Sequence, residues 1–333
     1  MKIAVFDTHH YDQSALVIAN ARFGHTLQFF EARLTDKTVE LAAGFDAVCP
    51  FVNCRLTEPV LVRLKALGVR LITLRAAGYN GIDVAAANRL GVRVVRVPAY
   101  SPHAVAEHAF ALLLSLARKI HRAHARVREL NFSLDGLEGF ELFGKTFGCI
   151  GVGRIGAAAI AIARGFGLRV LAYDSVPNQT LAADLGFEYV GLDRLLAESE
   201  VVSLHVPLTP QSRHIIDAAA LARMKPGSFL INTSRGAVID TGALIKALKS
   251  RHLGGVGLDV YEMEEEVFFQ DLSNEMLTDD TLARLLTFPN VLITSHQGFL
   301  THEALATIAE TTLANASAFE RGENLVNEVR ASG

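Results

Sequence analysis

The 333-residue chain has few cysteines and no long hydrophobic run. Cys49, Cys54 and Cys149 are its 3 cysteines, and their spacing matches neither a metal-binding nor a redox motif, so we expect buried free thiols in a reducing cytoplasm. The most apolar stretch, Ala109 to Ala117, has about half the length that a bilayer-spanning helix needs. Met1 to Asp7 reaches an acidic residue at once and lacks the pattern of a secretory signal.

The chain also lacks a large excess of charge of either sign. The 32 basic and 35 acidic residues are interspersed and give a formal net charge of −3, and no long block of one sign occurs outside Glu264 to Glu266. A surface of this kind argues against nucleic acid and anionic membranes as partners.

Histidines gather in two places, but neither place has the spacing of a metal site. His103, Glu107 and His108 do not match the zinc-binding pattern of metalloproteases or its inverted form. His121 and His124 lie among arginines, which is typical of a solvated helix end. No cysteine or second carboxylate supports either group, so we expect no metal.

The length of the chain predicts two domains. In the first 98 residues, short β-rich runs alternate with segments of helical length, with strands expected over 3–6, 26–30, 47–51, 71–76 and 93–97. This alternation predicts a parallel sheet covered on both faces. The first part contains no phosphate-binding glycine motif, so it is expected to form a domain separate from a nucleotide site.

A glycine-rich turn lies near the middle of the chain. An apolar segment from Thr146 stops at a G-x-G-x-x-G pattern, and a helix-period run follows at once, which is the context of a dinucleotide-binding turn. The first glycine allows the tight turn, the second lets backbone approach a pyrophosphate, and the third lets helix and strand pack closely. The helix N-terminus then offers N–H groups to the phosphates. The cofactor-binding residues expected here are Gly151, Gly153, Arg154, Ile155 and Gly156.

Asp174 supports this interpretation. It ends the next expected strand, 168–174, at the distance from the glycines where an acid meets the ribose hydroxyls of a dinucleotide. A carboxylate there also repels a 2′-phosphate. The sequence therefore predicts NAD rather than NADP.

Further strands are expected over 201–206, 228–231, 255–260 and 291–294, with helices beginning near Asp217 and Asp240. In an open parallel sheet, ligands bind outside the carboxyl ends of the strands, so the residues just after each strand become candidates. Those expected at the cofactor are Val206, Pro207, Thr233, Ser234 and Asp259.

The strand ends also carry residues suited to hydride and proton transfer. Reduction of a carbonyl needs a proton for its oxygen, and histidine, whose ordinary pKa is about 6.5, suits that exchange. His296 follows the last strand. A pair with Glu264 would stabilise its imidazolium form and favour a proton donor in the reducing direction. The alternative for Glu264 is a charge in a solvated acidic run.

Arg235 offers a planar fork that grips a carboxylate through two parallel hydrogen bonds. A structural ion pair is the alternative, but a position at a strand end favours substrate. Asp259 is expected either to orient Arg235 or to tune the site electrostatically.

Several motifs in one order make the sequence resemble the D-isomer-specific 2-hydroxyacid dehydrogenases, most closely the fermentative D-lactate dehydrogenases. The motifs are Arg75-Ala76-Ala77-Gly78-Tyr79-Asn80, Val97-Pro98-Ala99-Tyr100-Ser101-Pro102, Gly151 to Gly156, Asn232-Thr233-Ser234-Arg235-Gly236, Gly257-Leu258-Asp259-Val260-Tyr261-Glu262 and His296-Gln297-Gly298-Phe299-Leu300-Thr301. Gly298 departs from the expected pattern and is predicted to loosen the pocket slightly.

The resemblance implies that Arg235 binds the substrate carboxylate, that Glu264 and His296 handle the proton, and that Asp259 affects cofactor and pH behaviour. It also implies that closure of a cleft is part of turnover and that the protein is a homodimer or a tetramer of such dimers. The substrate-binding residues it implies are Ala77, Gly78, Tyr100, Arg235, His296 and Phe299.

The implied architecture is α/β, with a doubly wound Rossmann NAD-binding domain, 101–297, inserted into a flavodoxin-like substrate domain, 1–100 and 298–333. A long helix begins at Pro102 and is expected to run without a break to Ile120 as a connecting strut. A second helix is expected over 304–319. The segment 262–289 is expected to be an irregular loop covering the strand ends.

The predicted function is reversible, NAD-dependent reduction of pyruvate to D-lactate. One alternative is a bulkier or different 2-oxo acid, such as 2-oxoisocaproate, phenylpyruvate, hydroxypyruvate or glyoxylate, because one methylene changes discrimination by only about 1 to 3 kcal/mol. An alternative of another class is an NAD(H)-sensing binding protein like the corepressors built on this fold.

Overall fold

The computed structural model describes residues 1–330, which form two compact units. Unit 1 comprises Met1–Ser101 together with the segment that begins at Phe299, and unit 2 comprises Pro102–Gly298. Unit 2 is thus inserted into unit 1, and each crossover lies one residue from the boundary predicted from the sequence. Among the described residues, no helix combines the length and the apolar character needed to cross a membrane.

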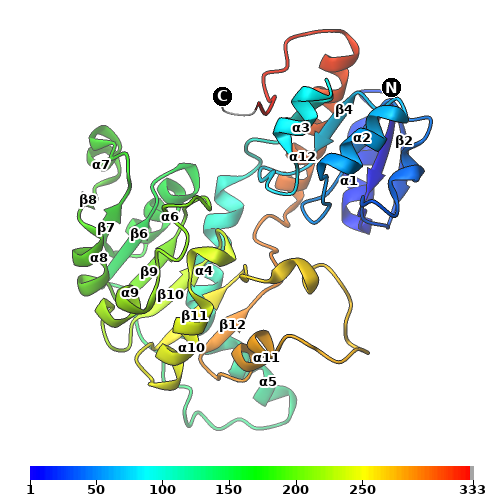
Figure 1. Cartoon of the computed structure of the whole chain (residues 1–333). Helices are drawn as coiled ribbons and strands as arrows, with labels where there is room; N and C mark the ends of the chain where they lie inside the picture. The colour runs from blue at the N-terminus through cyan, green and yellow to red at the C-terminus, as the bar shows by residue number, and fades with distance from the viewer. Residues whose placement is uncertain (331–333) are drawn as a thin grey trace. The chain divides into compact units, whose positions relative to one another are not determined.

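Unit 1 is a parallel five-stranded sheet with the order β2-β1-β3-β4-β5 (Figure 1). This is the strand order of flavodoxin-like sheets, in which the order reverses next to the first strand. The elements are β1 (Lys2–Phe6), α1 (His10–Asn20), β2 (Thr26–Phe30), the 3-10 helix η1 (Val39–Ala42), β3 (Ala47–Cys49), α2 (Glu58–Ala66), β4 (Leu71–Leu74), α3 (Val84–Arg89), β5 (Arg93–Arg96) and α12 (His302–Glu320).

Unit 2 is a parallel seven-stranded sheet with the order β12-β11-β10-β9-β6-β7-β8. The order reverses at β6, between β7 and β9, as in a Rossmann sheet, so the predicted fold class is confirmed. The elements are α4 (Pro102–Ala117), α5 (Ile120–Arg128), β6 (Thr146–Ile150), α6 (Arg154–Gly165), β7 (Arg169–Tyr173), α7 (Gln179–Leu185), β8 (Glu188–Tyr189), α8 (Leu192–Glu198), β9 (Val201–Leu204), α9 (Ala218–Arg223), β10 (Phe229–Asn232), η2 (Gly236–Val238), α10 (Thr241–Lys249), β11 (Gly255–Leu258), η3 (Glu264–Glu266), α11 (Asp280–Leu286) and β12 (Val291–Ile293).

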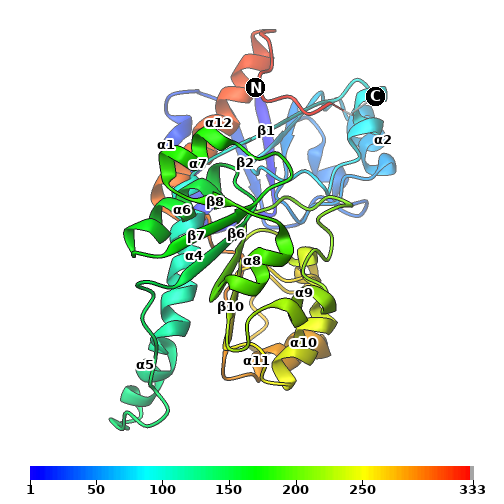
Figure 2. The ribbon, with the colours of Figure 1, turned by 90° about the vertical axis from the view of Figure 1, so that its left-hand side faces the viewer.

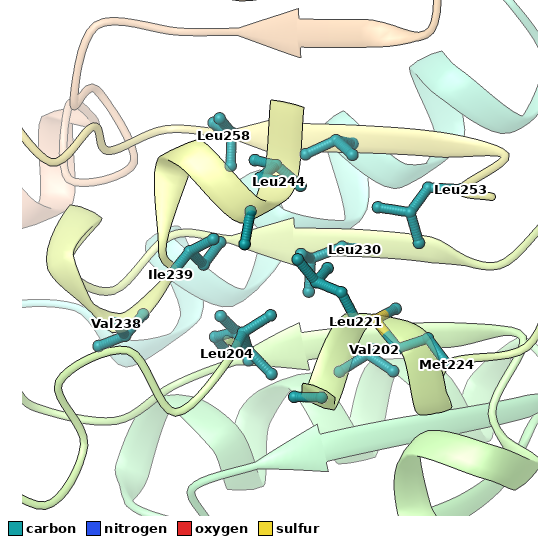
Figure 3. Close-up of a cluster of buried hydrophobic side chains, with 14 of the residues drawn as sticks. Val202, Leu204, Leu221, Met224, Leu230, Val238, Ile239, Leu244, Leu253 and Leu258 are labelled. Atoms are coloured by element: carbon teal, nitrogen blue, oxygen red, sulfur yellow. The ribbon is translucent and has the colours of Figure 1, made fainter. Parts of the chain in front are cut away.

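Both faces of the unit 2 sheet are buried, because successive strand residues point to opposite faces and each face is covered by helices. Val202, Leu204 and Leu230 pack beneath α9 and α10, as the close-up in Figure 3 shows. Their neighbours Val201 and Ile231 point the other way and pack in the cluster formed with α4 and α6. The apolar runs in the sequence therefore become central strands, which leaves their ends as the candidate places for ligands.

A buried arginine organises the carboxyl ends of the unit 1 strands. Arg75 follows β4, is only 2% exposed, and donates hydrogen bonds to the carbonyl oxygens of Phe6 (2.9 Å), Asp7 (2.6 Å) and Cys49 (3.1 Å). Its Nη2 also lies 3.4 Å from Oδ2 of the buried Asp12. Because buried carbonyl groups and a buried carboxylate all need partners, this guanidinium fixes the strand ends around the loop that carries Ala77 and Gly78.

Two expectations about regular structure were wrong. The helix predicted to run from Pro102 to Ile120 ends at Ala117, because Lys119 adopts a left-handed conformation (φ 52°) and α5 starts after it. The segment 262–289 is not a plain loop, since it contains η3 and the helix α11. Asp279 caps α11 by accepting a hydrogen bond from the backbone N–H of Leu282 at 2.9 Å.

Candidate functional site

The glycine-rich turn joins β6 to α6, and its three glycines have three different environments. Gly151 has φ of 91°, and a Cβ there would lie 2.6 Å from the carbonyl oxygen of His205. A Cβ on Gly156 would lie 2.0 Å from the carbonyl oxygen of Gly151, so close packing of helix and strand requires glycine. Gly153 has open space, with nothing within 4 Å of an added Cβ. The turn is therefore closed on the protein side and open where a phosphate would approach.

The N-terminus of α6 faces that open side. Gly153 is its N-cap and provides no side-chain hydrogen bond, so the first N–H groups of the helix, including those of Arg154 and Ile155, are not capped by it. Asp174 follows β7 and accepts hydrogen bonds from the backbone N–H groups of Val152 (2.7 Å) and Val176 (2.9 Å). The structure thus brings the acid directly beside the turn, as the spacing predicts.

The turn after β10 carries Thr233, Ser234 and Arg235 and is shaped by a buried amide. The side chain of Asn232 donates to the carbonyl oxygen of Arg235 at 2.9 Å and accepts from the N–H (3.0 Å) and hydroxyl (2.8 Å) of Ser234. Oγ1 of Thr233 is buried and has no hydrogen-bond partner among the described residues. Since buried hydroxyl groups are normally satisfied, this oxygen is suited to a polar ligand.

These features together fit a dinucleotide. Val206 and Pro207 follow β9, and Cγ1 of Val206 would be 2.7 Å from a Cβ on Gly151. The open Gly153 and the α6 N-terminus follow β6, and the unsatisfied Thr233 hydroxyl follows β10, two strands away in the same parallel sheet, with β9 between them. That edge is where doubly wound sheets bind nucleotides.

Arg235 has an extended backbone, and Nη1 of its guanidinium donates to the carbonyl oxygen of Ser234 at 2.6 Å. The other N–H groups of the fork have no hydrogen-bond partner in the described part of the chain and can bind an anion. Gly236 follows it at a point of close approach, because a Cβ there would lie 2.1 Å from the carbonyl carbon of Tyr261. The Arg235 turn therefore packs closely against the loop that leads to Glu264.

The predicted pair of His296 and Glu264 is formed. Nδ1 of His296 lies 2.8 Å from Oε1 of Glu264, and their side chains are 22% and 18% exposed. The second carboxylate oxygen of Glu264 accepts a hydrogen bond from the backbone N–H of Tyr261 at 2.9 Å. An ionised carboxylate only accepts, so Nδ1 carries the proton of this bond and Nε2 is left to exchange a proton with a ligand.

Asp259 is the most heavily bonded carboxylate in unit 2. Its Oδ1 accepts from the hydroxyl of Thr294 (2.5 Å) and the N–H of Gln297 (2.8 Å), and its Oδ2 accepts from the N–H of Gly298 (2.8 Å). Burial raises the pKa of this carboxyl, but hydrogen bonds from His108 and Thr294 outweigh it and hold the pKa of Asp259 below its ordinary value. Asp259 therefore stays ionised and anchors the loop that carries His296.

This arrangement bears on two expectations. Of the two roles predicted for Asp259, orienting Arg235 or tuning the site, the first has no support in its bonds, because the carboxylate accepts from donors at 108 and 294–298. The effect of Gly298 on a pocket stays a prediction, but its local role is visible. A Cβ there would lie 3.0 Å from Oδ2 of Asp259, so glycine lets the backbone close onto the carboxylate.

In unit 1 the predicted substrate residues also follow strand ends. Ala77 and Gly78 follow β4, and the carbonyl oxygen of Ala77 accepts a hydrogen bond from Arg96 at 2.8 Å. The rings of Tyr100 and Phe299 lie 6.4 Å apart in an edge-on contact.

Sequence reasoning missed two members of this aromatic cluster. Tyr11 and Phe51 contact Phe299 with ring centroids 6.3 and 6.4 Å apart. Phe51 follows the end of β3, so the strand-end rule applied to unit 2 would have found it, whereas Tyr11 lies in the first turn of α1, after the loop that follows β1. Within residues 1–330, no group of three His, Cys, Asp or Glu side chains has the geometry of a metal site.

Comparison with known proteins agrees with this geometry. Residues 110–298 match the family model described as "D-isomer specific 2-hydroxyacid dehydrogenase, NAD binding domain". The chain is 51% identical to the D-lactate dehydrogenase of Escherichia coli (strain K12) over 99% of this chain and 100% of that relative.

Solved structures show the same similarity. The apo-structure of D-lactate dehydrogenase from Escherichia coli has a TM-score of 0.91 and 50% identity, covering 99% of this chain and 100% of that one. A D-lactate dehydrogenase from Aquifex aeolicus, complexed with NAD and lactic acid, has a TM-score of 0.86 and 34% identity, covering 99% of this chain and 100% of that one. The resemblance predicted from the motifs is confirmed.

The glycine turn leads to a test that separates folding from binding. We expect Gly153→Ala to keep the thermal stability of the parent, since its Cβ meets open space, but to weaken NADH binding by about tenfold or more because the methyl group occupies the phosphate approach. Gly156→Ala is the matched variant and is expected to lower the melting temperature. Fluorescence titration with NADH and calorimetry measure both, and unchanged NADH affinity in Gly153→Ala would contradict the assignment.

Proposed function

Since the chain belongs to the D-isomer-specific 2-hydroxyacid dehydrogenase family, we propose that it reduces pyruvate to D-lactate reversibly with NADH. The observation that carries the proposal is the 2.8 Å pair of His296 and Glu264, which follows strand ends in the same sheet as Arg235. The names of relatives about half identical over the whole chain support lactate as the product.

In unit 2, His296, Glu264 and Arg235 are proposed to have separate roles in the reaction. Bound NADH supplies the hydride for the carbonyl carbon. Nε2 of His296 donates a proton to the carbonyl oxygen, and Glu264 stabilises the imidazolium form before transfer and keeps Nδ1 protonated. Arg235 binds the substrate carboxylate through charge-assisted hydrogen bonds, each worth about 1.5 to 3 kcal/mol. In the reverse direction, neutral His296 accepts the hydroxyl proton.

The residues of unit 1 are proposed to select the acid. Backbone N–H groups near Ala77 and Gly78 would bind its carboxylate, and Tyr100 and Phe299 would contact its side chain. The rings of Tyr11, Phe51 and Tyr100 contact Phe299, so the side chain of the acid would meet an apolar surface. A relative structure named for D-2-hydroxyisocaproate is 34% identical, which keeps bulkier 2-oxo acids as the second candidate.

The substrate preference and the role of His296 as proton donor can be tested in the same assay. We expect NADH oxidation to be fastest in kcat/KM with pyruvate among pyruvate, 2-oxoisocaproate, phenylpyruvate, hydroxypyruvate and glyoxylate, with D-lactate as the product. His296→Gln is expected to lower kcat by about 10²-fold or more, because a general acid is lost. His252→Gln serves as the control, because His252 precedes β11 and so lies at the amino end of the strand, opposite the end that carries the candidate site. Near-normal turnover in His296→Gln would exclude the proposed proton donor.

The nucleotide preference is proposed to come from Asp174, whose carboxylate lies beside the glycine turn. We expect kcat/KM with NADH to exceed that with NADPH, because the carboxylate repels a 2′-phosphate. Asp174→Asn should reduce that preference by about tenfold or more, which corresponds to about 1.4 kcal/mol. Steady-state kinetics with both nucleotides measure it, and equal efficiency in the unaltered enzyme would remove the assignment.

We also propose that the protein is a homo-oligomer that pairs through α5 and the chain after it. Figures 1 and 2 show this segment at the end of α4, extending away from the unit 2 sheet. It exposes large apolar side chains, with Leu130 79%, Phe132 69%, Leu134 81% and Phe143 80% exposed. Clustered exposure of this kind is typical of a protein interface.

The oligomer has its own test. The parent should sediment at a multiple of the single-chain mass, and Phe132→Asp with Leu134→Asp should shift it toward a single chain, because charges cannot be buried unpaired in an interface. Met276→Asp with Val326→Asp is the control, since both side chains are equally exposed elsewhere. A parent that sediments as a single chain at micromolar concentration would contradict the proposal.

A further inference from the structure

His108 lies on α4, outside the residues used by the proposed chemistry, and contacts the carboxylate that anchors the His296 loop. Its Nε2 lies 2.9 Å from Oγ1 of Thr294 and 3.2 Å from Oδ1 of Asp259. The side chain of His108 is 16% exposed, and that of Asp259 is 2% exposed. The three side chains come from α4, from the end of β11 and from the end of β12, so they connect three elements of unit 2.

The hydrogen-bond pattern determines whether Nε2 of His108 donates or accepts. Thr294 has one hydroxyl proton, and it is donated to Asp259 at 2.5 Å. The ionised carboxylate has no proton to donate. Nε2 of His108 therefore must be the donor in its contacts, whichever charge the ring carries, and it completes the set of groups that hold Asp259 ionised and buried.

Asp259 in turn shapes the backbone that carries His296. The carbonyl oxygen of Asp259 accepts a hydrogen bond from the N–H of His296 at 2.7 Å, and its carboxylate accepts from Gln297 and Gly298. His296 has φ of 50°, in the left-handed region that a non-glycine residue adopts only when its surroundings hold it there. Because this conformation is unfavourable for a non-glycine residue, the loop needs the hydrogen bonds to Asp259 more than a loop with an extended backbone would.

The groups of this cluster are closely packed. A Cβ on Gly298 would lie 3.0 Å from Oδ2 of Asp259 and 3.5 Å from Cδ2 of His108, so the backbone, the carboxylate and the imidazole are in close contact. Movement of any one of them shifts the others. A displacement of the proton donor by about 1 Å is enough to cost about 10²-fold in rate.

We propose that His108 is a positioning residue of this enzyme: by donating from Nε2 to Asp259 and Thr294, it holds the loop 294–298 so that His296 meets Glu264. The proposal rests on the proposed function of His296. It assigns to α4 a part in proton transfer that acts through Asp259 and Thr294.

The test replaces the donor in two ways. His108→Leu removes the donor, whereas His108→Gln keeps an N–H near the position of Nε2. We expect His108→Leu to lower kcat with pyruvate by about tenfold or more while NADH affinity stays within about twofold, and His108→Gln to recover most of kcat. His103→Leu is the matched control, because His103 is an exposed histidine on the first turn of the same helix.

A second measurement does not depend on activity. Amide hydrogen exchange at Gln297 and Gly298 should become faster in His108→Leu and stay close to the parent in His108→Gln and His103→Leu. If His108→Leu does not fold, Thr294→Val removes the partner hydroxyl at nearly constant volume and is expected to give the same loss and the same faster exchange.

The outcomes separate the two proposals. Unchanged kcat and unchanged exchange in His108→Leu would overturn the role of His108, and so would a His108→Gln variant as impaired as His108→Leu. If the parent fails to turn over pyruvate or any other 2-oxo acid but the exchange pattern follows the expected order, the proposed function fails while the role of His108 in holding the loop stands.

Discussion

The arrangement of the candidate site depends on one buried carboxylate. Asp259 lies at the end of a central strand, and its oxygens gather donors from the Thr294 hydroxyl, from two successive backbone N–H groups and from His108. Removing a buried charge from such donors costs several kcal/mol, so the loop has no alternative conformation of similar energy. The position of His296 follows from that constraint, because its N–H binds the carbonyl oxygen of the same residue.

The rest of the site follows from the geometry of parallel sheets. All strands of a parallel sheet end at the same edge, so short loops far apart in sequence reach one region and each contributes one kind of group. In unit 2 these are an open phosphate turn, an arginine with free donors and an imidazole paired with a carboxylate. In unit 1 the corresponding edge is fixed by Arg75, whose guanidinium binds carbonyl groups at the ends of two strands.

Much of this was predictable from the sequence, because it depends on local patterns. Apolar runs of strand length and the glycine spacing predicted the fold class, and they predicted that Asp174, Arg235 and His296 follow strands, as they do in the structure. The pair of Glu264 and His296 was predicted from their chemistry and is present in the structure.

What the sequence did not reveal depends on contacts between distant residues. Nothing near Asp259 indicates that His108 binds it, since the two are far apart along the chain and meet only after α4 packs on the sheet. The sequence also does not show that Gly298 permits a close approach of the backbone to the carboxylate of Asp259. The break at Lys119 could not be predicted because lysine is an ordinary helix residue, and nothing in the local sequence indicates its left-handed conformation.

Glu264 fixes the tautomer of His296, whose loop is held in place by Asp259. Nitrogen-15 NMR of ring-labelled histidine tests it most directly, with the His296 signals assigned by comparison with His296→Gln. We expect neutral His296 to carry its proton on Nδ1, with Nε2 unprotonated. A neutral ring protonated on Nε2 would contradict it.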